Sequence, residues 1–365
     1  MLDDHAAPQT TPPAAGPRLS ARVLLILAAV LLAVGLTAGI VVWRAVSPHY
    51  YSTNAMVAAV ALPHPGCTCL ALIRYSDAVG SVRVTTNGGA TWRRQTLGAL
   101  TPQGLAFGDA THGWIVGDSS KNGGDSSVLA TTDGGATWTK QPLHTTLFLQ
   151  EVTCVGAGRC WVVGGNVHDR GTVVATTDGG AHWKVQLRTG REQLVAVTFA
   201  DADTGWAFGE SGDVFATSDG GARWSKKKMP SVAGISGAAC FGARHVWCIG
   251  VGARKNVIVA STDAGATWKQ TYIGDDGLTA ISFSDERHGW VVGDDGLILA
   301  TTDGGATWTK QRSGTDADLR CVAFADATHG LAAGSRWSGG DPEAGLVGTV
   351  LLRTADGGGT WAQVH

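Results

Sequence analysis

Residues Thr301-Thr302-Asp303-Gly304-Gly305-Ala306-Thr307-Trp308 decide the fold, because the chain repeats this stretch along most of its length. The copies carry an acidic or amide residue at the third position: Asn87, Asp133, Asp178, Asp219, Asp263, Asp303 and Asp356. Each copy ends in a tryptophan: Trp92, Trp138, Trp183, Trp224, Trp268, Trp308 and Trp361. Consecutive copies lie 40 to 53 residues apart. A repeat of roughly 40–50 residues is typical of a propeller or a solenoid.

Each copy reads as the turn of a β-hairpin. Short β-rich runs precede and follow it, as at residues 296–302 and 307–311. The aspartate can accept backbone N–H groups and so fix the shape of the turn, and the glycines allow positive φ without steric cost. The closing tryptophan can bury on the order of 150–250 Å². We therefore predict a set of hairpins, each held to the core by its own indole ring.

A second feature repeats between these turns. Phe107, Phe199, Phe283 and Phe324 precede Trp114, Trp206, Trp290 and Leu331 by seven residues, and Cys154 and Cys240 hold the phenylalanine position before Trp161 and Trp247. Each repeat then contains four strands, as at 279–283, 290–293, 297–301 and 307–311. Seven such repeats predict an all-β, seven-bladed propeller over residues 55–365.

The pattern S/T-x-D-x-G-x-T-W resembles the Asp-box, or BNR repeat, which is a folding element and not a catalytic site. The spacing of the boxes, with the connecting segment Phe-x-Asp-x-x-His-Gly-Trp-x-Val-Gly, resembles the photosystem II stability/assembly factor family of the sialidase superfamily. That resemblance implies a seven-bladed propeller that acts as an assembly scaffold for membrane-protein subunits. Related propellers also occur in bacteria without photosystems.

The N-terminal part of the chain has a different composition. Residues 1–22 are rich in Pro, Ala and Thr and predict a disordered tail, and residues 44–54 predict a short tether. Residues 23–43 carry no charge and would span about 31 Å as a helix, enough to cross a bilayer. Arg18 and Arg22 before this segment favour a cytoplasmic N-terminus and a single-pass protein of the cell membrane with an extracytoplasmic propeller. A cleaved signal peptide is the alternative.

Seven cysteines in an extracytoplasmic domain suggest disulfides. We expect Cys154 to pair with Cys160 and Cys240 with Cys248, since each pair spans the first two strands of a blade. Cys321 could join Cys67 or Cys69 and so link the last blade to the first. We expect no metal site and no cofactor, because Cys67-x-Cys69 lacks the usual ligand spacing and histidine partners.

The connections between the second and third strands vary most in length, and loops on a rigid scaffold carry function. Of 14 tryptophans, seven close boxes, five begin second strands and Trp43 ends the apolar segment, which leaves Trp337 in a long loop. Tryptophan and arginine are favoured interface anchors. We predict a binding surface on these loops: Lys121, His168, Asp169, Arg170, Arg254, Lys255, Arg336, Trp337, Asp341 and Glu343.

Composition and motifs bear on the class of function. The net charge of −2, without a basic stripe, argues against a nucleic-acid partner. A sialidase needs an arginine cluster, a tyrosine nucleophile and a carboxylate partner, and no such set is evident. Xyloglucanase-type glycosidases also carry Asp-boxes, but their cleft lies between two propellers and this chain has room for one. We expect a non-catalytic propeller that binds a protein or glycan partner at the cell envelope. A glycan-active hydrolase and a structural envelope protein are the alternatives.

Overall fold

A computed structural model describes residues 55–64, 67–74, 80–87, 90–98, 100–119, 126–143, 147–166, 171–190, 192–229, 232–337 and 346–364. The predicted tail (1–22), membrane segment (23–43) and tether (44–54) lie outside these residues. Within the described part of the chain, no helix is both long enough and apolar enough to cross a membrane.

The described strands form seven antiparallel four-stranded sheets, which we call blades 1 to 7 in chain order. Their strands are β1 (Ala55–His64), β2 (Cys67–Arg74), β3 (Gly80–Thr85), β4 (Arg93–Thr96), β5 (Leu100–Phe107), β6 (Gly113–Ser119), β7 (Ser127–Thr131), β8 (Thr139–Gln141), β9 (Phe148–Val155), β10 (Arg159–Gly165), β11 (Thr172–Thr176), β12 (Lys184–Arg188), β13 (Leu194–Phe199), β14 (Gly205–Gly209), β15 (Asp213–Thr217), β16 (Ser225–Lys228), β17 (Ala233–Phe241), β18 (His245–Val251), β19 (Asn256–Ser261), β20 (Lys269–Gly274), β21 (Leu278–Phe283), β22 (Gly289–Gly293), β23 (Ile298–Thr301), β24 (Thr309–Gln311), β25 (Asp318–Phe324), β26 (Gly330–Trp337), β27 (Leu346–Thr354) and β28 (Ala362–Gln363). A short 3₁₀ turn, η1 (Asp294–Gly296), separates β22 from β23.

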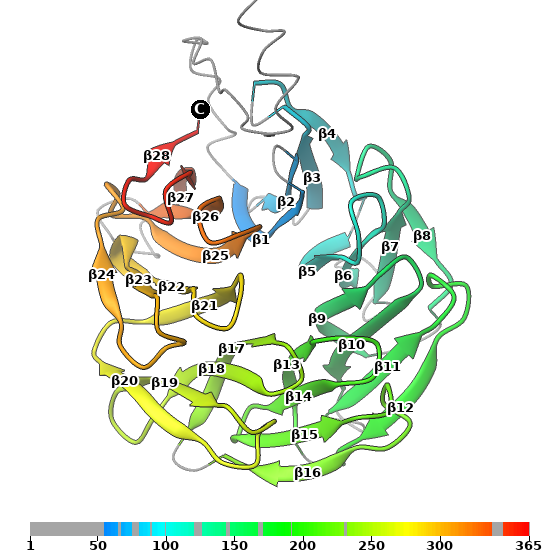
Figure 1. Cartoon of the computed structure of the whole chain (residues 1–365). Coiled ribbons are helices and arrows are strands. Elements are labelled where there is room, and N and C mark those ends of the chain that lie inside the picture. Colours follow the sequence, from blue (N-terminus) through cyan, green and yellow to red (C-terminus); the bar gives the residue numbers. More distant parts are fainter. Residues whose placement is uncertain are drawn as a thin grey trace, which may run out of the picture. The chain divides into compact units, whose positions relative to one another are not determined.

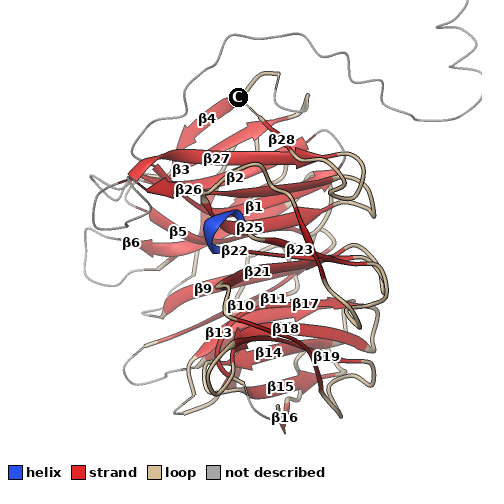
Figure 2. Ribbon diagram, turned by 90° about the vertical axis from the view of Figure 1, so that its left-hand side faces the viewer, coloured by secondary structure: helices blue, strands red, loops and turns tan. Residues whose placement is uncertain are grey.

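The blades follow one another around a ring, with the first strand of each blade innermost and the fourth outermost (Figure 1). Seen from the rim, the strands run between the two faces of this ring (Figure 2). The prediction of an all-β propeller is thereby confirmed. Blade 1 meets blade 7 through contacts of β1 with β25, β26 and β27. Val60 of β1 packs there with Leu331 and Leu351, so buried apolar side chains close the ring.

The repeated box is a closed hydrogen-bond network. In blade 6, the Asp303 carboxylate accepts the Thr301 hydroxyl at 2.8 Å, the Thr307 N–H at 2.9 Å and the Thr307 hydroxyl at 2.6 Å. These bonds, the Thr307 hydroxyl first, lower the pKa of Asp303 to about 2. The Thr301 hydroxyl oxygen also accepts the Gly305 N–H at 2.9 Å. The box aspartate is thus engaged within its own turn, in the role of a folding element.

The second repeated turn is held in the same way. Asp285 accepts the backbone N–H groups of Arg287 at 2.7 Å and His288 at 2.8 Å, and its other oxygen lies 2.8 Å from His288 Nδ1. The Asp–His turns that begin at Asp109 and Asp326 repeat this arrangement. These histidines therefore fix turns between the first and second strands of their blades.

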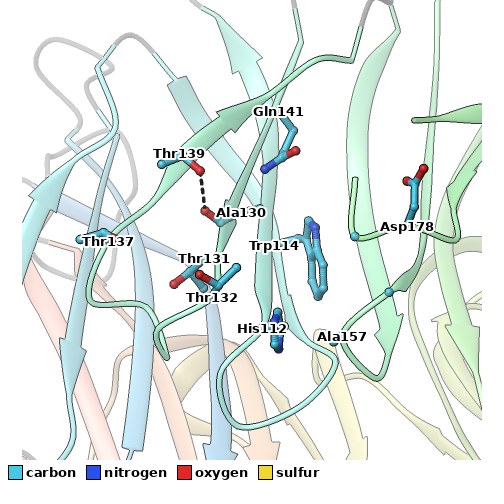
Figure 3. Close-up of a pocket in the computed structure, with 12 residues that line it drawn as sticks. His112, Trp114, Ala130, Thr131, Thr132, Thr137, Thr139, Gln141, Ala157 and Asp178 are labelled. Carbon is cyan, nitrogen blue, oxygen red and sulfur yellow. Dashed lines mark hydrogen bonds between the residues drawn. The ribbon is translucent and has the colours of Figure 1, made fainter. Parts of the chain in front are cut away.

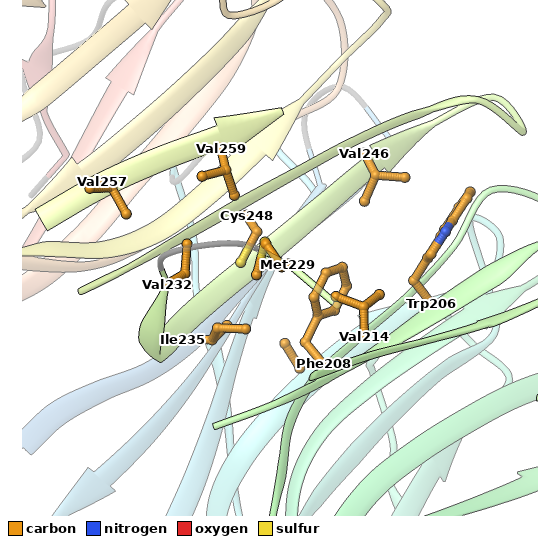
Figure 4. Packing of buried hydrophobic residues seen from close by; sticks show 11 residues of the cluster. Trp206, Phe208, Val214, Met229, Val232, Ile235, Val246, Cys248, Val257 and Val259 are labelled. Atoms are coloured by element: carbon orange, nitrogen blue, oxygen red, sulfur yellow. The ribbon is translucent and has the colours of Figure 1, made fainter. Parts of the chain in front are cut away.

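The core lies in the seams between neighbouring blades. Figure 4 shows the seam of blades 4 and 5, where Trp206 and Phe208 of β14 meet Val246 and Cys248 of β18. Trp206 is 1% exposed and Phe208 is fully buried. Each such cluster combines buried side chains of two neighbouring blades, so a blade buries its apolar residues against the next blade.

The structure contains one of the two disulfides predicted within a blade. Cys154 of β9 and Cys160 of β10 form a bond, with Cα atoms 4.1 Å apart. The two residues are direct partners in the β9–β10 register. Their spacing of six residues therefore places both sulfur atoms on the same side of the hairpin.

The predicted Cys240–Cys248 bridge is wrong, because both thiols are free. Cys240 pairs with Val246 and Cys248 with Ala238, so the extra two residues of spacing place the cysteines diagonally and not opposite each other. Cys321 is also a free, buried thiol, so the predicted link to Cys67 or Cys69 is not formed. The side chains of Cys67 and Cys69 lie outside the described residues.

We predict that reduction of the Cys154–Cys160 bond lowers the free energy of unfolding by about 2 kcal/mol, since the bond closes a short loop in the unfolded chain. Denaturant unfolding of the full chain with and without a phosphine reductant measures this change. The matched control is Cys154→Ser, whose stability should not respond to the reductant. A reductant effect of the same size in that variant would show that another cysteine pair is responsible.

Candidate functional site

The connections between strands divide into two faces. The box face carries the boxes and the turns between first and second strands. The loop face carries the connections between second and third strands and those that lead to the next blade. Its described connections are 210–212, 252–255, 275–277, 294–297 and 312–317. All ten residues of the predicted binding surface belong to segments at or beside connections between second and third strands.

Arg336 and Trp337 end β26 at the loop face. Arg336 Nε donates to Asp316 Oδ1 at 2.7 Å, and its Nη2 donates to Thr315 Oγ1 at 3.2 Å. Arg336 therefore joins the end of β26 to the connection between β24 and β25. Trp337 pairs through its backbone with Leu346, and its side chain lies outside the described residues.

Arg254 and Lys255 are exposed in the connection between β18 and β19. Lys255 Nζ lies 3.1 Å from Asp275 Oδ2 in the connection that leads to blade 6. These residues belong to blade 5 and Arg336 belongs to blade 7, so the described part of the predicted surface forms two separate groups. The remaining predicted residues lie outside the described part of the chain: Lys121, His168, Asp169, Arg170, Asp341 and Glu343.

Further ion pairs lie between these two groups. Arg320 Nη2 lies 3.1 Å from Asp318 Oδ2 and 3.9 Å from Asp294 Oδ1. Burial, partly offset by Arg320, raises the pKa of Asp294 above its ordinary value. Asp295 in η1 has a φ of 53°, a left-handed conformation that aspartate tolerates better than most residues. The described loop face of blades 5 to 7 is therefore patterned with charges of both signs.

A feature that sequence reasoning missed lies on the innermost strands. Every first strand has a register shift at the same place, as at Leu194/Ala196 of β13 and Leu278/Ala280 of β21. Bulges commonly redirect side chains near functional sites. In blades 2 to 7, the residue at this bulge lies three positions before the repeated phenylalanine or cysteine of its blade. These residues are Gly104, Glu151, Ala196, Gly237, Ala280 and Cys321.

Glu151 is the one acidic side chain among those small or apolar residues. In the aligned repeats, this contrast is the feature that could have identified Glu151 as unusual. Its Oε2 accepts the Val197 N–H of the next blade at 2.8 Å. Burial raises the pKa of Glu151 to about 7, against the lowering effect of this bond. The carboxyl group therefore titrates near neutral pH and joins the first strands of blades 3 and 4.

A pocket of about 400 Å³ opens on the box face between blades 2 and 3. Figure 3 shows Gln141 above the indole of Trp114, with Asp178 on the opposite side of the pocket that all three line. His112 lies at the other end of the Trp114 ring. A related pocket of about 300 Å³ lies between blades 6 and 7, lined by Trp290, Gln311 and Gly357.

His112 and Asp178, which line the pocket between blades 2 and 3, have local partners. His112 Nδ1 lies 2.9 Å from Asp109 Oδ2, and Asp178 Oδ2 lies 2.7 Å from His182 Nδ1. Among the residues that the structure describes, no group of three or more histidine, cysteine or acidic side chains could hold a metal ion.

Comparisons with known proteins agree with this geometry. The profile of the family described as "Photosynthesis system II assembly factor YCF48" matches residues 183–276 and 273–365. A structure described as "YCF48 bound to D1 peptide" is 18% identical, has a TM-score of 0.62, and covers 88% of this chain and 99% of its own. YCF48 from Cyanidioschyzon merolae is 19% identical, with a TM-score of 0.62 and coverages of 83% and 96%. No curated protein matches by sequence.

A glycosidase has a related fold. The GH74 enzyme of Niastella koreensis is 12% identical with a TM-score of 0.54, over 85% of this chain and 66% of that chain. At these identities the structural likenesses establish the fold alone. The family profile spans the sequence from residue 183 to residue 365, which is half of its length. The chain therefore belongs to the family of the photosynthesis system II assembly factor YCF48.

Proposed function

We propose that this chain is a non-catalytic assembly factor that binds a protein partner through its loop face. The observation that carries the proposal is membership of the YCF48 family, together with likeness over 99% of the length of a YCF48 propeller that holds a D1 peptide. Because a YCF48 protein binds a peptide, we expect the ligand of this chain to be a protein as well.

The choice of the loop face rests on the contrast between the two faces. On the box face, the aspartates and most threonines bond within their own turns, as Asp303 does with Thr301 and Thr307. On the loop face, Lys255 and Arg336 make exposed ion pairs, which cost little to exchange for contacts with a partner. The loop face carries charges of both signs. It therefore favours a partner surface with complementary charges of both signs, which is a common feature of protein surfaces.

We extend the proposal to the N-terminal segment. Residues 23–43 would anchor the propeller in a membrane, with the N-terminus in the cytoplasm and the loop face available to an extracytoplasmic partner. A glycan partner at the same face is the alternative ligand class. Protease protection in intact cells would test the topology, because an extracytoplasmic propeller is digested by added protease.

The likeness to a GH74 enzyme supports one competing function, glycoside hydrolysis. This class of reaction normally requires two carboxyl groups that flank the scissile bond. Turnover of a panel of fluorogenic glycosides, abolished by a single carboxylate substitution, would favour the hydrolase over the assembly factor.

Charge reversal tests the loop face. We expect Arg254→Glu with Arg336→Glu to reduce recovery of the partner by roughly tenfold, which corresponds to about 1.4 kcal/mol of lost affinity. Crosslinking in intact cells, followed by quantitative mass spectrometry, measures the recovery. The matched control is Arg223→Glu with Arg287→Glu on the box face, which changes the net charge equally. Equal recovery from both double variants would reject the proposed surface.

A further inference from the structure

One hydrogen bond recurs between neighbouring blades. The indole N–H at the start of a second strand donates to a carbonyl in the box of the next blade. The donors and acceptors are Trp161 to Gly220 at 3.2 Å, Trp206 to Ala264 at 3.1 Å, Trp247 to Gly304 at 2.8 Å and Trp290 to Gly357 at 2.9 Å. The acceptor always follows the box aspartate directly.

In two seams a glutamine amide shares this carbonyl. Gln186 Nε2 donates to the Gly220 carbonyl at 2.9 Å, and Gln311 Nε2 donates to the Gly357 carbonyl at 3.0 Å. Each glutamine lies three residues after the tryptophan of its own box. A peptide carbonyl is thus held by two neutral donors, an indole and a primary amide. We call this arrangement the Trp–Gln clamp.

In the seam of blades 2 and 3 both donors are present, but among the described residues no carbonyl accepts the Trp114 N–H. Trp114 is 1% exposed, and its Nε1 is buried without a hydrogen-bond partner among the described residues. Gln141 occupies the clamp position of blade 2, three residues after Trp138. Its side-chain amide makes no hydrogen bond within the described part of the chain. Gly179, whose carbonyl would complete the pattern, lines the pocket of about 400 Å³ together with both donors. A buried donor without a partner is costly, so an acceptor that reaches it gains affinity.

We propose that this open Trp–Gln clamp is a binding site for a main-chain carbonyl of an extended peptide segment from a partner protein. The closed clamps of the same molecule define the ligand, since each holds a peptide carbonyl. Both donors are neutral, and His112 and Asp178 are engaged with Asp109 and His182, so the site favours a neutral amide over an anion. The clamp lies on the box face and is independent of the surface assigned to the loop face.

The indole N–H signal of Trp114 tests the clamp directly. The full chain, labelled with ¹⁵N-tryptophan, is titrated with acetyl-glycyl-glycinamide, and Trp114→Phe assigns the signal. We expect a saturable shift of the Trp114 signal and no shift of the Trp290 signal, whose donor is already occupied. In the free protein, the Trp114 indole proton should exchange with solvent faster than that of Trp290.

Two glutamine variants provide the control. Gln141→Leu should weaken binding of the probe by about fivefold, since it removes one hydrogen bond. Gln311→Leu should leave probe binding unchanged, and the remaining tryptophan signals report whether each variant is folded. The proposal is overturned if the Trp114 proton is as protected as that of Trp290 and does not respond to the peptide, because the clamp would then close on Gly179. A shift with methyl glucoside but not with the peptide would also overturn it.

Discussion

Trp290→Ala is expected to lower the free energy of unfolding by about 3–5 kcal/mol, the range for removal of a buried aromatic side chain. Trp290 is 2% exposed and stacks on Phe324 of blade 7 with ring centroids 3.4 Å apart. Its Nε1 also donates to the Gly357 carbonyl. The substitution therefore opens a cavity and removes a hydrogen bond between blades 6 and 7. Urea unfolding followed by circular dichroism measures the change.

The variant Trp290→Phe separates packing from hydrogen bonding. It keeps an aromatic ring against Phe324 but leaves the Gly357 carbonyl without the indole donor, so we expect a smaller loss of about 1–2 kcal/mol. Gln311 Nε2 still donates to that carbonyl and limits the loss. If Trp290→Ala cost less than Trp290→Phe, or neither changed stability, the seam between blades would not be what holds the ring together.

Glu151→Gln is expected to stabilise the protein at pH 8 by roughly 2–3 kcal/mol and to have no effect near pH 4. Burial raises the pKa of Glu151 from 4.5 to about 7. The unfolded chain therefore releases this proton at a lower pH than the folded chain. Stability attributable to the protonated group is fully present below pH 4.5 and is lost as the pH rises through about 7.

Glutamine is the matched replacement at this position, because its oxygen can still accept the Val197 N–H. Thermal or denaturant unfolding of both proteins between pH 4 and pH 8 provides the comparison. Stability curves that run parallel over this range would contradict a raised pKa. The box aspartates have the opposite dependence: the pKa of Asp303 is about 2, so the stability that they contribute is lost as the pH falls below about 4.

The propeller and its repeated turns could be predicted from the sequence because each is encoded locally and repeatedly. The box aspartate, its threonines and its glycines all lie within eight residues, so their bonding follows from one turn. For Trp290, the sequence predicts the position in the blade but not the hydrogen bond to the next blade. Its place at the start of a second strand follows from the spacing, but its contact with Gly357 joins residues 67 positions apart and depends on how blades pack.

The cysteine predictions show where spacing stops being informative. Cys240 and Cys248 are two positions further apart in the sequence than Cys154 and Cys160 are. The strand register shows that this longer spacing prevents the two thiols from lying opposite each other. The bulge beside Glu151 is a backbone feature with no fixed residue type, so the sequence could mark the odd carboxylate but not its geometry. The binding surface was predicted from the variable lengths of the loops, which the sequence shows directly. The open clamp at Trp114 could not be predicted in this way, because it depends on contacts between blades.

Photo-crosslinking from single positions on each face tests the central claim most directly. A benzophenone amino acid replaces Arg254 or Asp275 on the loop face, and Arg223 or Arg287 on the box face, in the full chain within intact cells. Mass spectrometry then identifies the covalent adducts and the position from which each arose. Binding through the loop face predicts that Arg254 and Asp275 capture the same protein partner, and that Arg223 in blade 4 and Arg287 in blade 6 do not capture that partner. Adducts confined to the two box-face positions, or none from any position, would contradict it.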